Sequence, residues 1–154
     1  GPLPAWAQEL ECKLFYVAPP ITDVFGEAVF FHKATKSLLV TDCALKLNAS
    51  APKILESYGY DGTPGPISAE QWRYKAIAFD FVTARGKDER DFKLLQSPAA
   101  IVNPLLRFLV YRRCPEQAAA WVTDVAKWPF KRIVAAHLAS PYDCSPQQFL
   151  DAFG

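Results

Sequence analysis

The chain has 154 residues, of which 51% are hydrophobic and 21% are charged. This length and composition predict one globular domain with a sizeable core, spanning residues 1–154. The formal net charge is +1, from 17 basic and 16 acidic residues scattered along the chain, so nucleic acid is not an expected partner.

The cysteine and methionine content narrows the class of protein further. The four cysteines show no Cys-x-x-Cys spacing, which excludes a zinc ribbon; they are Cys12, Cys43, Cys114 and Cys144. We interpret them as buried apolar side chains in a reducing compartment, with a disulfide as the alternative. Because the chain contains no Met, even at position 1, we expect residues upstream of it. Residues 94–111 are too often interrupted by Pro and polar residues to predict a transmembrane segment.

Three strands are predicted at the start of the chain. Residues 10–17 change from alternating to continuously apolar, which favours a strand, and Pro19-Pro20 ends it. Residues 27–32 and 37–41 then predict a hairpin around the polar turn at 33–36.

Helical character is predicted after Asp42. Residues 52–58 form a short amphipathic segment, and Ser68 is a cap candidate for a helix over 69–81. Residues 85–91 are a mixed charge run, which is typical of a solvated loop.

The second half is predicted to be mostly helical. Ser97-Pro98 predicts the start of a helix that Asn103-Pro104 kinks or divides, and a further helix is predicted over 115–127. Residues 132–137 predict a short buried strand, and Ser145-Pro146 a final helix to residue 153. This order predicts a mixed α/β (α+β) fold with an antiparallel hairpin.

Asp42 and His137 each directly follow a run of buried-type strand residues. Strand ends in α/β folds commonly carry functional side chains, because the strand fixes the backbone while the side chain reaches a crevice. We therefore expect that the two residues can converge. The alternative is structural, with Asp42 as a turn or helix-start residue and His137 as a hydrogen-bonded core histidine.

Other catalytic patterns do not occur. The chain has no Gly-x-Ser-x-Gly elbow and no Cys in a setting that lowers its pKa. Gly59, Gly62 and Gly65 lie in a Pro-rich turn region without the Lys-Ser/Thr ending of a phosphate loop, so they predict tight turns.

Two segments, 30–42 with its His-Lys-x-Thr-Lys-Ser-Leu-Leu-Val-Thr-Asp pattern and 128–137, carry a resemblance to a known family. They resemble the second half of a metallo-β-lactamase-like domain. More closely, the chain resembles an uncharacterised domain-of-unknown-function family in that superfamily, familiar from cyanobacteria, algae, plants and other bacteria. The similarity runs from about residue 3 to residue 153.

The resemblance implies a complete fold that is a four-layered αββα sandwich, of which this chain would be the C-terminal half. It implies that Asp42 matches the bridging metal ligand and His137 the last histidine ligand. The superfamily's His-x-His-x-Asp-His signature is absent, and residues 18–23 lack a further expected histidine. His32 does not match that position.

Metal chemistry is therefore the alternative rather than the expectation. A dinuclear hydrolytic site needs several imidazoles and carboxylates, whereas this chain has two histidines. We expect no cofactor, and we interpret Asp42 and His137 as remnant metal ligands. A mononuclear site for zinc or another divalent metal, formed by these two with His32 or Asp143, is the alternative.

If the chain is half of a larger fold, we expect it to bind other protein. Half of a two-sheet sandwich would leave its inward sheet face and the helices around Leu105, Phe108 and Val110 partly uncovered. We expect a non-catalytic accessory or structural subunit that docks onto other protein subunits; the alternative is the ligand-bearing half of a metal-dependent hydrolase. The resemblance implies a plastid location, in the stroma or on the stromal face of a thylakoid complex such as a photosystem, with the cytoplasm as the alternative.

Overall fold

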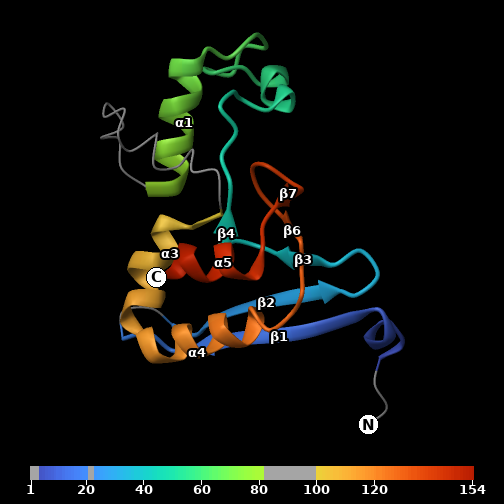
Figure 1. Cartoon of the computed structure of the whole chain (residues 1–154). Helices are drawn as coiled ribbons and strands as arrows, with labels where there is room; N and C mark the ends of the chain where they lie inside the picture. Colours follow the sequence, from blue (N-terminus) through green and yellow to red (C-terminus); the bar gives the residue numbers. More distant parts are fainter. Residues whose placement is uncertain (1–3, 21–22, 82–99) are drawn as a thin grey trace.

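A five-stranded mixed sheet forms the centre of the protein (Figure 1). The computed structural model describes residues 4–20, 23–81 and 100–154. The strand order is β1-β2-β3-β6-β7. The strands are β1 (Leu10–Val17), β2 (Phe25–His32), β3 (Ser37–Val40), β6 (Arg132–Ala135) and β7 (Tyr142–Asp143). β3 and β6 run parallel, and the other neighbouring pairs are antiparallel. The predicted mixed α+β class is confirmed.

The predicted hairpin is present, and its polar residues fold its turn. His32 Nδ1 lies 2.6 Å from Thr35 Oγ1, which lies 2.8 Å from Ser37 Oγ. Arg132 of the neighbouring β6 donates to the same Ser37 oxygen over 2.7 Å. Lys36 takes the left-handed conformation with φ of 51°, as tight turns between strands often require. The polar part of the motif that carried the resemblance therefore has a structural role here.

Four α-helices are found in the described residues: α1 (Ala69–Phe81), α3 (Pro104–Leu109), α4 (Pro115–Val125) and α5 (Pro146–Phe153). The bounds of α1 agree with the prediction, whereas α4 ends two residues before Lys127. α5 begins with a capping box, in which Ser145 Oγ accepts from the Gln148 N–H and Gln148 Oε1 accepts from the Ser145 N–H. This cap explains why the Ser-Pro signal predicted the helix start correctly.

Two predictions between the strands and α3 are wrong. Residues Ala44–Leu45 and Ile101–Val102 are not helical but pair as the short antiparallel strands β4 and β5. Asn103 accepts hydrogen bonds from the N–H groups of Leu105 and Leu106, so Pro104 begins α3 rather than kinking a longer helix. The predicted start at Ser97-Pro98 and the charged loop at 85–91 lie outside the described residues.

Shorter helical turns complete the fold. The segment predicted as amphipathic and helical is a 3-10 helix, η2 (Lys53–Ser57). Two more 3-10 turns, η1 (Ala5–Gln8) and η3 (Tyr111–Arg113), precede β1 and α4. Within the described residues, the structure contains no helix with the length and apolarity needed to cross a membrane.

The main core lies between the sheet and the helices α4 and α5, which pack on one of its faces (Figure 1). Alternate strand residues point to this layer, including Phe31, Leu38 and Ile133. Phe31 stacks on Trp128 with the ring centroids 5.7 Å apart. A separate small cluster holds α1 against the chain that follows β4; it consists of Leu45, Leu47, Trp72 and Ala76.

Candidate functional site

Asp42 and His137 meet at one edge of the sheet. Because β3 and β6 are parallel and Val40 pairs with Ala135, their carboxyl ends lie side by side. Asp42 Oδ1 is 3.2 Å from His137 Nε2, and the two side chains are 47% and 50% exposed respectively. The prediction that the two residues converge is confirmed, and together they form a solvent-accessible carboxylate–imidazole pair.

The loop that presents His137 is held by backbone hydrogen bonds. The Ala136 N–H donates to Val40 O over 3.1 Å, and the Ala139 N–H donates to Lys46 O over 3.0 Å. Between them, Leu138 has a φ of 65°, a left-handed conformation that is unfavourable for leucine. The surrounding contacts therefore fix this loop against a local strain.

The pair has the spacing of two ligands of one metal ion. Two donors at zinc distances on a tetrahedral ion lie about 3.3 Å apart, close to the separation of Asp42 Oδ1 and His137 Nε2. The residues considered as a third ligand lie elsewhere, because His32 pairs with Ser37 and Asp143 with Arg132, at the opposite ends of β3 and β6. Within residues 4–20, 23–81 and 100–154, no three His, Cys, Asp or Glu side chains form a group that could hold a metal ion. The separation is equally that of an ion pair, so the interpretation of Asp42 and His137 as remnant metal ligands stays a prediction.

Glu27 is the site residue that sequence reasoning missed. It lies on β2, is only 5% exposed, and accepts hydrogen bonds at Oε1 from the N–H groups of Cys43 and Asp42 over 3.0 and 3.3 Å. The Thr41 hydroxyl donates to the same oxygen and the Tyr111 hydroxyl to Oε2. Glu27 therefore positions the turn that carries Asp42. Its alternation with Val29 and Phe31 along the strand was a signal that Glu27 faces inward.

Burial around Glu27 keeps its neighbours neutral. Burial of the thiol, followed by the negative charge of Glu27, raises the pKa of Cys43 well above its usual value. Burial likewise raises the pKa of Tyr111, with smaller contributions from Cys43 and Glu27. Neither group can supply a thiolate or phenolate at neutral pH, so this cluster is suited to holding structure rather than to nucleophilic attack.

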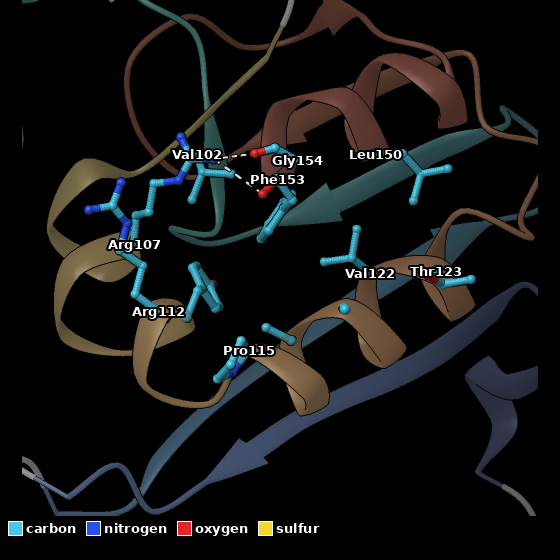
Figure 2. A pocket seen from close by; sticks show the side chains of 12 residues that line it. Val102, Arg107, Arg112, Pro115, Val122, Thr123, Leu150, Phe153 and Gly154 are labelled. Carbon is cyan, nitrogen blue, oxygen red and sulfur yellow. Dashed lines mark hydrogen bonds between the residues drawn. The ribbon is translucent and has the colours of Figure 1, made fainter.

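A cavity of about 380 Å³ lies beside this cluster, between η3, α4 and α5. Its walls include Tyr111, Val122 and Phe153, and Arg107 and Arg112 also line it (Figure 2). Arg107 Nη2 donates to the carbonyl oxygens of Phe153 and Gly154 over 3.1 and 3.2 Å. That arginine thus stabilises the carboxyl end of α5, where a cation is favourable.

The face of the sheet opposite α4 and α5, which we call the outer face, exposes apolar side chains along β1. Leu14 and Tyr16 of β1 are 69% and 72% exposed. The strand register places further apolar residues on the same face, which are partly buried: Leu10, Ala28, Phe30, Leu39 and Val134. One end of the outer face is polar, with His32, Ser37, Arg132 and Asp143. Trp6 of η1 contacts Phe30 at one end, with ring centroids 6.0 Å apart.

Two expectations about apolar residues are corrected by burial. Cys43, Cys114 and Cys144 are buried as expected, but Cys12 is exposed on the outer face, where alternation along β1 turns it away from the core. Among the helix residues expected to lack cover, Phe108 is exposed, whereas Val110 is buried in the main core. None of the four cysteines is in a disulfide.

The structure is a mixed α+β domain whose sheet carries helices on one face and exposes apolar side chains of β1 on the other. The chain belongs to the family described as Domain of unknown function (DUF4336), whose model matches residues 1–71 and 67–154 and so covers the whole chain. No curated protein and no solved structure matches the chain. The domain-of-unknown-function part of the resemblance is confirmed, and the metallo-β-lactamase-like relationship stays a prediction.

Proposed function

We propose that the chain is a non-catalytic accessory or structural subunit that docks onto a larger protein assembly through the outer face. The observation that carries this proposal is the exposure of Leu14 and Tyr16 on β1, next to partly buried apolar residues of β2, β3 and β6 on the same face. Large contiguous apolar surfaces of this kind mark interaction sites, because leaving them in water costs free energy that a partner recovers.

The proposal includes the predicted ancestry. In a metallo-β-lactamase-like αββα sandwich, two sheets pack face to face and each carries helices on its other side. A sheet covered by α4 and α5 on one face and apolar on the other has the character of one such half. The outer face would then lie about 10 Å from a second sheet, contributed by the rest of the domain or by another subunit.

The docking proposal is tested with a charge on the outer face. Val134→Lys on β6 places an ammonium group there, and Gln117→Lys adds the same charge on the exposed side of α4 as a control. Both proteins are expressed with a tag in the native organism and analysed by native gel electrophoresis. We expect the wild-type and Gln117→Lys chains in a larger complex, and Val134→Lys at the mass of the released chain with its melting temperature retained.

Two results would contradict docking through this face. The first is a wild-type chain that migrates in native extracts no larger than a dimer of itself. The second is a folded Val134→Lys chain that stays in the complex. If Val134→Lys does not fold, Ala28→Lys on β2 is the second variant. It places the charge on the same face and replaces a smaller side chain.

A second candidate function is the ligand-bearing half of a metal-dependent hydrolase, favoured by the 3.2 Å separation of Asp42 Oδ1 and His137 Nε2. A bound divalent metal would supply a Lewis acid and an activated water, and these two side chains would be two of its ligands. Metal analysis of the purified chain tests this candidate. Stoichiometric zinc that is lost in both Asp42→Ala and His137→Ala, but kept in Asp143→Ala at the other end of the sheet, would favour the hydrolase over the docking subunit.

The proposed location follows the resemblance to a family of photosynthetic lineages. We place the subunit in the plastid, in the stroma or on the stromal face of a thylakoid complex such as a photosystem. Fractionation of plastids that express the tagged chain checks this. Recovery of the chain in the cytoplasm alone would contradict it.

A further inference from the structure

Among the described residues, the first strand of the sheet has an open backbone edge. β1 ends the strand order, and no described strand pairs with its second side. The Lys33 N–H donates to Glu9 O over 3.0 Å, which sets the alternation of the antiparallel ladder between β1 and β2. Odd-numbered β1 residues therefore direct their backbone groups to β2. Four residues direct theirs away from the sheet, namely Leu10, Cys12, Leu14 and Tyr16.

This edge differs from the other edge of the sheet. β7 has two residues, whereas β1 has eight, so β1 offers the longer row of unpaired N–H and C=O groups. In Figure 1, β1 forms the lower border of the sheet, with α4 in front of it. Three of the four outward residues also have exposed side chains, namely Cys12, Leu14 and Tyr16. Long, exposed and apolar edge strands are templates for pairing with another strand.

We propose that β1 pairs antiparallel with β1 of a second copy of this chain, about a two-fold axis at Cys12, to form one continuous sheet. In such a dimer, residues whose backbone groups point outward must lie opposite outward residues of the other copy. Three two-fold registers pair at least three of these four residues in each copy. Their axes lie at Cys12, Lys13 or Leu14.

Charge complementarity selects among these registers. An axis at Lys13 sets that ammonium opposite its own copy, which is unfavourable. An axis at Leu14 sets Lys13 opposite Phe15 and Glu11 opposite Val17. The axis at Cys12 sets Glu11 opposite Lys13 twice and Leu10 opposite Leu14 twice, so that opposite charges and aliphatic side chains face one another. Within its own chain Lys13 is paired with Asp124, and Glu11 accepts from Trp128 Nε1, so the contact between copies adds a second opposite charge to each.

This inference does not rest on the proposed function. Docking uses the side chains of the outer face, whereas the dimer uses the backbone N–H and C=O groups at the edge of β1, and the docking variant Val134→Lys lies three strands from that edge. Pairing of two copies would join their two outer faces into one larger surface. The dimer is measured with the purified chain alone, and docking is measured in native extracts, so failure of one is separable from failure of the other.

Cysteine cross-linking tests the register. Cα atoms opposite one another in a hydrogen-bonded pair are about 5.5 Å apart, within the range of a disulfide. Mild oxidation of the purified chain should give a covalent dimer that is lost in Cys12→Ser, because Cys43, Cys114 and Cys144 are buried. In the Cys12→Ser background, Leu14→Cys should not cross-link to itself. Efficient Leu14→Cys cross-linking instead of Cys12 cross-linking would overturn the axis at Cys12.

A proline substitution tests the edge itself. The Leu14 N–H points away from β2, so Leu14→Pro removes a donor of the dimer while the ladder to β2 is kept. We expect the dimer measured by sedimentation equilibrium to weaken about thirtyfold, since two symmetric hydrogen bonds are lost, and Leu14→Val to leave it unchanged. A wild-type chain that stays monomeric at high concentration overturns the proposal. If Leu14→Pro does not fold, the Cys12 cross-link decides.

Discussion

The two faces of the sheet have similar apolar side chains but opposite surroundings. On the helix-covered face, Leu38 and Ile133 lie under α4 and α5 and are fully buried. On the outer face, Leu14 and Tyr16 are exposed. Both faces follow from the same strand sequences, because alternate residues point in opposite directions. The difference shows that an apolar strand residue in this chain contributes to stability on one face and is available to a partner on the other.

The largest expected effect separates these faces directly. Leu38→Ala on β3 removes a side chain that is 0% exposed and should cost about 3 kcal/mol of unfolding free energy, since it leaves a cavity. Leu14→Ala on β1 is the matched substitution at an exposed position and should cost less than about 0.5 kcal/mol. Urea unfolding of the purified chain, at a concentration low enough to keep it monomeric, measures both. Equal losses would show that the outer face is covered in the isolated chain.

The second prediction concerns Glu27, whose buried carboxylate lies on the helix-covered side of the sheet. Glu27→Ala leaves the N–H groups of Asp42 and Cys43 without their acceptor and should cost about 3 kcal/mol. Glu27→Gln keeps an acceptor oxygen and should cost less. Chemical unfolding of the two variants checks the order. If Glu27→Ala and Glu27→Gln lower the unfolding free energy equally, the fold depends on the carboxylate of Glu27 rather than on one acceptor oxygen.

Stability should also fall at alkaline pH, through groups on the covered side. Because burial raises the pKa of Cys43 in the folded protein, the unfolded chain releases this proton first. The contribution is fully present below the unfolded thiol pKa of about 8.5 and is lost as the pH rises toward the folded value. Urea midpoints between neutral and alkaline pH should fall, and Cys43→Ala should flatten the decline. A wild-type profile that is level, or one that rises, would contradict this.

The smallest expected effect is at the exposed pair. Asp42 and His137 are each about half accessible, so Asp42→Ala should change stability by less than about 1 kcal/mol. The change should shrink as salt is added, because exposed pairs are screened. A loss as large as that of Glu27→Ala would show that the Asp42 side chain, and not only its backbone N–H, is needed for the fold.

Sequence reasoning placed the pair but not the residue that positions it. Asp42 and His137 were found because each follows a buried strand run, a local pattern, and parallel pairing of β3 with β6 brought them together. Glu27 was passed over as an ordinary strand residue, although its alternation with Val29 and Phe31 marked it as inward-facing. The strands β4 and β5 were missed because two-residue strands carry too little periodicity to be distinguished from helix or loop.

The sequence by itself determined the bounds of β1 and α1, the hairpin after β2 and the capping box of α5, because periodicity, turn residues and caps act over a few neighbouring residues. Only the tertiary structure decided which face of the sheet the helices cover and which strand lies beside β3. Ser37 and Arg132 are 95 residues apart in the chain and nonetheless share a hydrogen bond. Such pairings depend on the closure of long loops and on the burial of distant apolar residues, which no local pattern encodes.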